Sequence, residues 1–419
     1  MSSSRSPSDG ERALAEILVQ AKLAPAGELP ELAGRASALF GAGDAQILLV
    51  DHGQRVLVPM LPSGAVGEPL AVDSTLPGLA FRRVEVQEVD TEHGRRLWIP
   101  LLEGIDRLGV FGLTVAAGDP LADARAHWLA ALLAELVVTK GLNSDAIARV
   151  ARRRPMSLAA EMQWALMPPL TAGTDRVVVS AMLEPAYEVG GDAVDYALET
   201  DMAHVAVLDP MGHDLAASVC ASLAIAAYRN VRRAGGTLPE MADAIERAIA
   251  GQFAQQHFTT AILATLDLRT GRLRWIDAGH PPALLLRGGQ LVKTLDARPD
   301  PPLGIGLTAQ VTVHEETLEP GDRLLFYTDG VVEARDQDGR FFGVQRLVDF
   351  VVRAEANGDA PPETMRRLSH AVLDHQGGHL QDDATHLMLE WLTDRDLMPL
   401  AGRRPARADG RPRAREPSP

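Results

Sequence analysis

The sequence has 419 residues, which is long enough for two or three domains with ordinary hydrophobic cores. With 46% hydrophobic and 23% charged residues it is globular in composition, and its formal net charge of −15 argues against nucleic acid or an anionic membrane as the main partner. No apolar run approaches the roughly 18 residues of a membrane span, and the start, MSSSRSPSDGER, lacks the apolar core of a signal peptide. A single cysteine, Cys220, excludes an intrachain disulfide, so we expect a cytoplasmic protein.

Residues 12–140 show the pattern of a small α+β domain, after a Ser- and Pro-rich start (1–11) that we expect to be disordered. The segment ALAEILVQAKL has helical spacing, and AQILLV and RVLVPML predict a hairpin around Asp51–Gln54. Three further strands are expected in VEVQEV, RRLWIPLL and LGVFGLTV, the last two joined by a short polar loop. A closing helix is predicted from Leu121 to Thr139, because its leucines recur on one face.

This order of elements, with IPLL and GVFGL paired across a short turn, resembles a GAF sensory domain. The resemblance is compatible with a small-molecule ligand, whose binding the sequence does not settle, and the domain has no cysteine for a covalent chromophore. We interpret His52 and His93 as solvated loop residues, because both fall in polar turns. An α+β module of another kind is the alternative.

The sequence pattern of residues 141–170 predicts a helical linker. The stretch IARVARRRPMSLAAEMQWALMP is interrupted at Pro155 and stopped by Pro168-Pro169. Its apolar stripe favours packing against a partner helix, which would make the protein a homodimer; a plain interdomain helix is the alternative. The stripe consists of Leu158, Met162, Ala165 and Leu166.

Residues 171–395 are rich in strands with a few inserted helices, a pattern that favours an α+β sandwich with a largely antiparallel core. Helices are expected at Asp214–Arg233, Pro239–Gln252, Gln345–Arg353 and Pro362–Leu373. The Arg- and Pro-rich tail, 396–419, is expected to be disordered.

Four acidic residues in this region fall at strand ends or turns. Asp209 ends the apolar run VAVLD, Asp192 follows Gly190-Gly191, Asp329 follows LLFYT, and Asp382 precedes DATHLML. A protein core rejects unpaired carboxylates, so we expect the four to converge on a cation. Hard oxygen ligands suit Mg²⁺ or Mn²⁺, and two such ions about 4 Å apart would activate a water for attack on a phosphate ester.

Five ordered motifs carry a second resemblance: EPAYEVGGDAVDY, AVLDPMGHDLAAS, HFTTAILATLDLRTGRLRWIDAGHPPALLLR, LLFYTDGVVEAR and QDDATHLML. Together with AAEMQWALMPPL before them, they resemble the SpoIIE/RsbU-type branch of the PPM (type 2C) metal-dependent serine/threonine phosphatases, over residues 160–392. The resemblance implies an α-β-β-α sandwich with two Mn²⁺ or Mg²⁺ ions at the edge of its central sheets.

Residue by residue, the resemblance implies five metal ligands, with Asp209 bridging the two ions and Pro210 contributing its backbone carbonyl. The five are Asp192, Asp209, Pro210, Asp329 and Asp382. It further implies that Asp383 holds the neighbouring loop, whereas Asp195 is not assigned to a metal.

Three positions depart from the family pattern. Pro210 and Asp214 stand where glycine is usual, and Ala193 replaces a larger residue. Proline keeps its carbonyl but loses its N–H, and Asp214 adds negative charge, although it also suits the N-cap of the next helix.

Other groups of residues give weaker indications of a zinc site or of a nucleophilic hydroxyl. A cluster of acids and histidines near the C-terminus suggests zinc, but its glycines are loop-like and no cysteine lies nearby. That cluster comprises His375, His379, Asp382, Asp383 and His386. We interpret His213 as a turn residue and His280 as structural, and no Ser-His-Asp arrangement supports Ser218, Thr259 or Thr260 as a nucleophile.

The resemblance implies a phosphatase for phosphoserine and phosphothreonine, regulated by the N-terminal domain and acting on STAS-type anti-sigma antagonist proteins of bacterial signalling. Two alternatives remain. One is a catalytically weak or inactive partner-binding regulator, suggested by Pro210 and Asp214. The other is a nucleotide phosphodiesterase, for which the sequence shows no clear base-binding groove.

Overall fold

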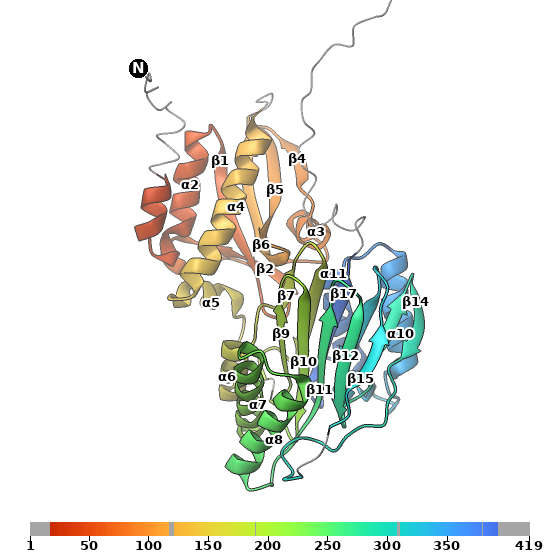
Figure 1. Cartoon of the computed structure of the whole chain (residues 1–419). Helices are drawn as coiled ribbons and strands as arrows, with labels where there is room; N and C mark the ends of the chain where they lie inside the picture. Colours follow the sequence, from red (N-terminus) through yellow and green to blue (C-terminus); the bar gives the residue numbers. More distant parts are fainter. Residues whose placement is uncertain (1–16, 117–120, 189, 308–310, 379, 393–419) are drawn as a thin grey trace, which may run out of the picture.

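The fold is taken from a computed structural model that describes residues 17–116, 121–188, 190–307, 311–378 and 380–392. The expected disordered segments, 1–11 and 396–419, lie outside these residues. Figure 1 shows an N-terminal α+β layer seated on one end of a larger C-terminal sandwich. No helix among the described residues is both long and apolar enough to cross a membrane.

The N-terminal domain is built on one antiparallel sheet with strand order β3-β2-β1-β6-β5-β4. The predicted hairpin is confirmed, since β1 pairs with β2 from Ile47↔Met60 to Val50↔Leu57. The pairing of β5 with β6 across a short turn is confirmed as well. The strands are β1 (Gly43–Val50), β2 (Val56–Met60), β3 (Leu70–Ala71), β4 (Gln87–Thr91), β5 (Gly94–Glu103) and β6 (Asp106–Val115).

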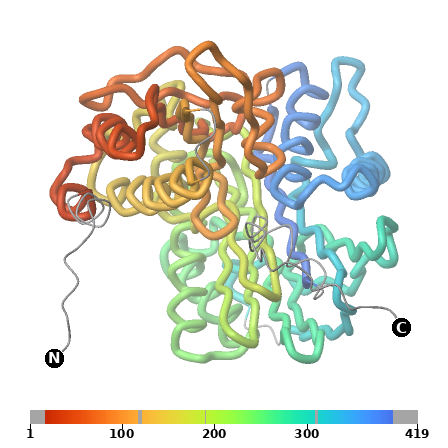
Figure 2. Tube along the Cα trace, turned by 90° about the horizontal axis from the view of Figure 1, so that it is seen from above, coloured from red at the N-terminus to blue at the C-terminus, as the bar shows by residue number. Residues whose placement is uncertain are grey.

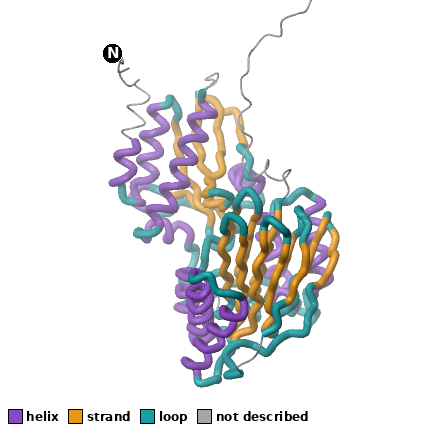
Figure 3. The backbone as a smooth tube through the Cα atoms, viewed as in Figure 1, coloured by secondary structure: helices purple, strands orange, loops and turns teal. Residues whose placement is uncertain are grey.

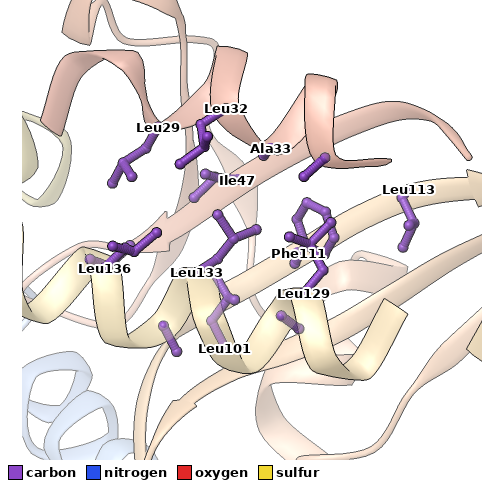
Figure 4. Packing of buried hydrophobic residues seen from close by; sticks show 14 of the residues in the cluster. Leu29, Leu32, Ala33, Ile47, Leu101, Phe111, Leu113, Leu129, Leu133 and Leu136 are labelled. Atoms are coloured by element: carbon purple, nitrogen blue, oxygen red, sulfur yellow. The ribbon is translucent and has the colours of Figure 1, made fainter. Parts of the chain in front are cut away.

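Two helices, α2 (Leu29–Leu39) and α4 (Ala122–Gly141), cover one face of this sheet, where Leu29, Leu133 and Phe111 pack together (Figure 4). The predicted closing helix therefore exists and buries the face that its leucines define. A third helix, α3 (Leu76–Arg83), packs on the opposite face. Neither α2 nor α3 is among the elements expected from the sequence.

The linker forms two helices, α5 (Asp145–Ala151) and α6 (Leu158–Leu166), and Pro155 lies in the break between them, as expected. Ser144 and Ser157 cap them by accepting hydrogen bonds from Ala146 N and Ala160 N. Helix α5 packs on the N-terminal domain, and α6 packs on the first long helix of the C-terminal domain.

The C-terminal domain is an α-β-β-α sandwich, as predicted (Figure 3). One sheet has the order β15-β12-β11-β10-β9 and is covered by α7 (Leu215–Arg233) and α8 (Leu238–Phe253). The other has the order β14-β13-β16-β17-β8-β7 and is covered by α10 (Val344–Ala356) and α11 (Pro361–His375). A third core fills the space between the two sheets.

The strands of the first sheet are β9 (Ala193–Leu198), β10 (Met202–Pro210), β11 (Thr259–Asp267), β12 (Arg272–Ala278) and β15 (His314–Thr317). Those of the second are β7 (Thr171–Gly173), β8 (Val177–Glu184), β13 (Leu284–Arg287), β14 (Gln290–Thr294), β16 (Arg323–Tyr327) and β17 (Ala384–Trp391). Every residue of β8 and β17 is buried, because helices cover one face of these strands and the other sheet covers the second.

Candidate metal centre

The first sheet brings Asp192 and Asp209 to the same edge. Strand β9 runs antiparallel to β10 with Ala193 opposite Leu208, so Asp192, just before β9, comes level with the end of β10. Asp209 is the last residue but one of β10, followed by Pro210 and then the Met211–His213 turn. The apolar run of β10 therefore ends in a carboxylate at the rim of the sandwich.

The second sheet presents Asp329 and Asp382 in the same way. Tyr327, the last residue of β16, pairs with His386 of the antiparallel β17, so the acid after β16 and the acids before β17 share an edge. Asp329 begins the short helix α9 (Asp329–Val332), and Asp382 lies in the loop between α11 and β17. Each sheet thus contributes two of the four predicted ligands.

Neighbouring acids at this rim raise one another's pKa values. Burial, together with the charges of Asp329 and Asp382, raises the pKa of Asp209 to about 7. Burial and the charge of Asp209 raise the pKa of Asp192 well above its usual range. Burial and the charge of Asp382 likewise raise the pKa of Asp329. None of the four acids forms an ion pair with a Lys or Arg that the structure describes.

A cation would relieve this mutual repulsion, and oxygen donors of this kind fit Mg²⁺ or Mn²⁺. As they stand, no three His, Cys, Asp or Glu side chains of the described residues form a group able to hold a metal ion. The chemistry of the donors therefore fits a divalent cation.

Asp383 holds the turn that carries Asp192. Its Oδ2 accepts hydrogen bonds from the backbone N–H groups of Gly190 at 2.8 Å, Gly191 at 2.7 Å and Asp192 at 3.2 Å. The side chain is buried, with a relative exposure of 7% for the residue. A carboxylate that accepts three backbone N–H groups is committed to this turn, which agrees with the loop-holding role expected for Asp383.

Two hydroxyl groups that the sequence analysis did not assign to the site also hold it. Thr328 donates to Oδ2 of Asp192 at 2.8 Å and accepts a hydrogen bond from Thr385 N at 3.0 Å. Ser218 of α7 donates to the carbonyl of Gly190. Thr328 belongs to the TDG motif, so its position next to Asp329 could have indicated that it supports the site.

A third supporting residue, Gln163, comes from helix α6. Its Nε2 donates to the carbonyl of Gly191 at 2.7 Å, and the side chain is fully buried. Its Oε1 is buried and has no hydrogen-bond partner among the residues that the structure describes. Burying a polar side chain among apolar residues costs free energy unless the side chain forms hydrogen bonds. The glutamine within AAEMQWALMPPL could therefore have been predicted to bind a buried polar group.

Two of the departures from the family pattern, Asp214 and Pro210, have identifiable structural roles. Asp214 caps α7 by accepting from Ala217 N at 3.0 Å, as expected from the sequence. Pro210 is the last residue of β10 and lies opposite Thr259. The carbonyl oxygen of Pro210 borders the Gly190–Asp192 turn, because a Cβ added to Gly191 would lie 3.5 Å from this oxygen. Asp195, which was not assigned to a metal, pairs with Arg229 and Arg232.

The histidines take structural roles. Burial lowers the pKa of His280 to about 3, and its Nδ1 lies 2.9 Å from Thr260 Oγ1. His386 is buried with Nε2 3.0 Å from the carbonyl of Met365 on α11. His375 contacts Arg346 and the carbonyl of Arg340. His379 lies outside the described residues, and the remaining members of the suggested zinc cluster do not gather around one point.

The sandwich, with acids from both sheets at one rim, defines the class: the C-terminal domain has the fold of the PPM phosphatases. Residues 199–392 match the family described as "Stage II sporulation protein E (SpoIIE)". The C-terminal domain is thus a SpoIIE-family PPM domain.

The chain is also similar to individual proteins, at 22–27% identity. The chain is 27% identical over 241 residues to Protein IcfG of Synechocystis, and the matched region covers 49% of this chain and 37% of IcfG. It is 22% identical over 237 residues to phosphoserine phosphatase RsbU of Bacillus subtilis, covering 56% of this chain and 69% of RsbU. A solved structure, the SiaA-PP2C domain of Pseudomonas aeruginosa, is similar with a TM-score of 0.47, 23% identity and coverage of 56% and 94%. The chain therefore spans little more than a third of the length of IcfG.

Proposed function

We propose that the C-terminal domain is a metal-dependent phosphatase that hydrolyses phosphoserine and phosphothreonine in proteins. The observation that carries this proposal is the convergence of Asp192, Asp209, Asp329 and Asp382 at one rim, where burial and mutual repulsion raise the pKa values of three of them. Two Mn²⁺ or Mg²⁺ ions there would supply the Lewis acidity that lowers the pKa of a water and offsets charge on a phosphate. The similarity to RsbU, a phosphoserine phosphatase, supports the substrate class.

In this proposal the protein's own residues prepare the site for the ions. Asp192 is oriented by Thr328, and its turn is fixed by Asp383. Asp209 and the Pro210 carbonyl complete the side contributed by the first sheet, and Asp329 and Asp382 the side contributed by the second. The site therefore offers oxygen atoms only, which suits a hard cation.

The competing proposal is a partner-binding protein without turnover. It rests on Pro210 and Asp214, and two observations weigh against it. The Asp214 carboxylate is engaged as the cap of α7, and Pro210 keeps its carbonyl beside the Gly190–Asp192 turn. Neither departure removes an oxygen atom from the proposed ligand set.

We further propose that the substrate is a phosphorylated STAS-type protein and that the N-terminal domain regulates the enzyme. The proposed division is a GAF-like sensory domain at 12–140 that binds a small molecule, a linker at 141–170 and a phosphatase domain at 171–395. The contact of Gln163 with Gly191 supports a regulatory linker, because it joins α6 directly to the turn that carries Asp192. The exposed Leu158 on α6 leaves an apolar position for pairing of two chains.

Phosphate release from a phosphoserine peptide tests the activity, measured with Mn²⁺, Mg²⁺ and EDTA for the wild type, Asp329→Asn and the control Asp338→Asn. We expect release that needs metal, is lost in Asp329→Asn and persists in Asp338→Asn, since Asp338 is exposed in a nearby turn. A folded wild type that binds a phosphorylated partner but releases no phosphate with either metal would support the partner-binding alternative. Hydrolysis of a cyclic dinucleotide in place of the peptide would support the phosphodiesterase.

A further inference from the structure

A group of charged side chains, all but one of them buried, joins the N-terminal domain to helix α11 of the phosphatase domain. Arg107 of β6 pairs with Glu363 of α11, with 3.0 Å between Nη1 and Oε2, and the side chains are only 4% and 6% exposed. Arg366, one turn further along α11, binds Glu363 at 2.8 Å and Asp73 of the N-terminal domain at 2.6 Å. Two positive and two negative side chains thus compensate each other across the boundary.

The turn between β1 and β2 completes this contact. The side-chain oxygen of Gln54 accepts a hydrogen bond from Arg107 at 3.0 Å, and the backbone carbonyl of Gln54 accepts one from Arg366 at 3.3 Å. His370 Nε2 lies 2.8 Å from the carbonyl of Gly53. Because burial lowers the pKa of His370 to about 4, the ring is neutral near pH 7 and its Nε2–H donates to that carbonyl. Figures 1 and 2 show the N-terminal domain and α11 side by side.

Helix α11 is continuous with the loop that carries Asp382 and Asp383. The helix ends at His375, whose ring contacts the carbonyl of Arg340 at 3.1 Å. The loop folds back on the end of the helix, since Gly378 N donates to Leu373 O and Gln381 N donates to Gln376 Oε1 at 3.1 Å. A shift of α11 therefore displaces the start of β17.

We propose that the N-terminal domain supplies positioning residues for the metal centre: Asp73, Arg107 and Gln54 fix α11, and α11 fixes the loop that carries Asp382. This inference rests on the proposed function, because it takes Asp382 to hold a metal ion. It differs from coupling through the linker, since Gln163 acts on the Asp192 turn and α11 acts on the opposite side of the site. The N-terminal domain is then part of the structure that completes the site.

Two variants open this contact from the N-terminal side. Asp73→Asn weakens the hold on Arg366, and Asp73 is largely exposed, so the domain keeps its fold. Gln54→Gly removes the amide that binds Arg107, and the φ of +50° at Gln54 is one that glycine adopts without strain. The matched control is Asp90→Asn, an exposed acid on β4 of the same domain.

The measurement is calorimetric titration of the metal-free full chain with Mn²⁺, together with hydrogen exchange of the backbone at 376–383 before metal is added. We expect both variants to bind at least one Mn²⁺ about fivefold or more weakly, and to exchange faster in this loop, whereas Asp90→Asn matches the wild type. Isotherms of both variants that coincide with the wild type would overturn the inference, as would equal weakening in Asp90→Asn. A wild type that binds no Mn²⁺ would refute the proposed function itself, so the two failures are distinguishable.

Discussion

Gln163 on α6 donates a hydrogen bond to the carbonyl of Gly191, 2.7 Å away, and so connects the linker to the residue next to a proposed metal ligand. Both groups are buried, and the other amide atom of Gln163, Oε1, has no hydrogen-bond partner within the described part of the chain. The orientation of the Asp192 turn therefore depends on a helix outside the sheets.

Replacing Gln163 by Ala leaves the Gly191 carbonyl buried without its donor. We expect Mn²⁺ affinity to fall about tenfold or more, the range found when residues that orient metal ligands are removed. Calorimetric titration of the metal-free protein measures this. Leu158→Ala on the same helix is the control, because Leu158 is 64% exposed. Unchanged affinity in Gln163→Ala would show that α6 does not support the turn.

Thr328→Val keeps the shape of the side chain and removes its hydroxyl. Asp192 then loses a donor and Thr385 N loses an acceptor in a buried site, so we expect unfolding free energy to fall by about 1–3 kcal/mol. Metal affinity should fall as well. Urea unfolding and Mn²⁺ titration measure the two effects, and Thr328→Ser should restore both. A serine variant as impaired as the valine would indicate that the methyl group, and not the hydroxyl, matters.

Gly190→Ala should disrupt the site for a steric reason. A Cβ at this position would overlap the backbone carbonyl of His213, which cannot move without shifting the turn after β10. We expect loss of phosphate release and of Mn²⁺ binding in a protein that stays folded. Gly251→Ala in α8 is the matched control: its Cβ meets nothing within 4 Å, and alanine favours a helix by up to about 1 kcal/mol. A Gly190→Ala protein with normal Mn²⁺ binding would contradict the packing described.

Glu184 should make stability depend on pH. Burial raises its pKa to about 7 from an ordinary value of 4.5, and the charge of Asp51 contributes. The protonated form is favoured in the folded state, so this stabilisation is complete below about pH 4.5 and is lost as the pH rises through 7. Glu184→Gln should therefore gain unfolding free energy relative to wild type between pH 5 and 8, by about 3 kcal/mol at most.

Urea unfolding at pH 5, 6, 7 and 8 checks this expectation for Glu184→Gln beside Glu199→Gln, whose side chain is exposed. The difference from wild type should grow with pH only in the first variant. Parallel curves for wild type and Glu184→Gln would show that Glu184 is already ionised in the folded protein near pH 5.

The sandwich could be predicted from the sequence because its strands are long apolar runs that end in sharp turns. The run VAVLD and the turn after it indicated both β10 and the position of Asp209 at the end of that strand. Helix α2 was harder to predict, because LPELAGRASAL contains a central glycine and small residues whose burial depends on packing against α4. The short strands β7 and β14 form chiefly through pairing with neighbours, which local pattern does not reveal.

The supporting residues of the site were less predictable than the acids. Asp192 and Asp383 were indicated by motifs, but Ser218 lies in an alanine-rich helix that reads as core packing, and its partner Gly190 is 28 residues away in sequence. The interface with α11 was beyond prediction for the same reason: Arg107 and Glu363 are separated by 256 residues, and each alone suits an exposed surface.

Two of the four acids stand on one sheet and two on the other, so any ions held among them would bridge the layers. The thickness of the sandwich then becomes a determinant of ligand spacing. Side chains of the inner faces, such as Val207 and Phe326, lie away from the rim yet keep the sheets apart. A substitution there that changes side-chain volume would alter the separation of Asp209 from Asp329. Such a substitution should lower the affinity for metal ions before it measurably lowers the free energy of unfolding.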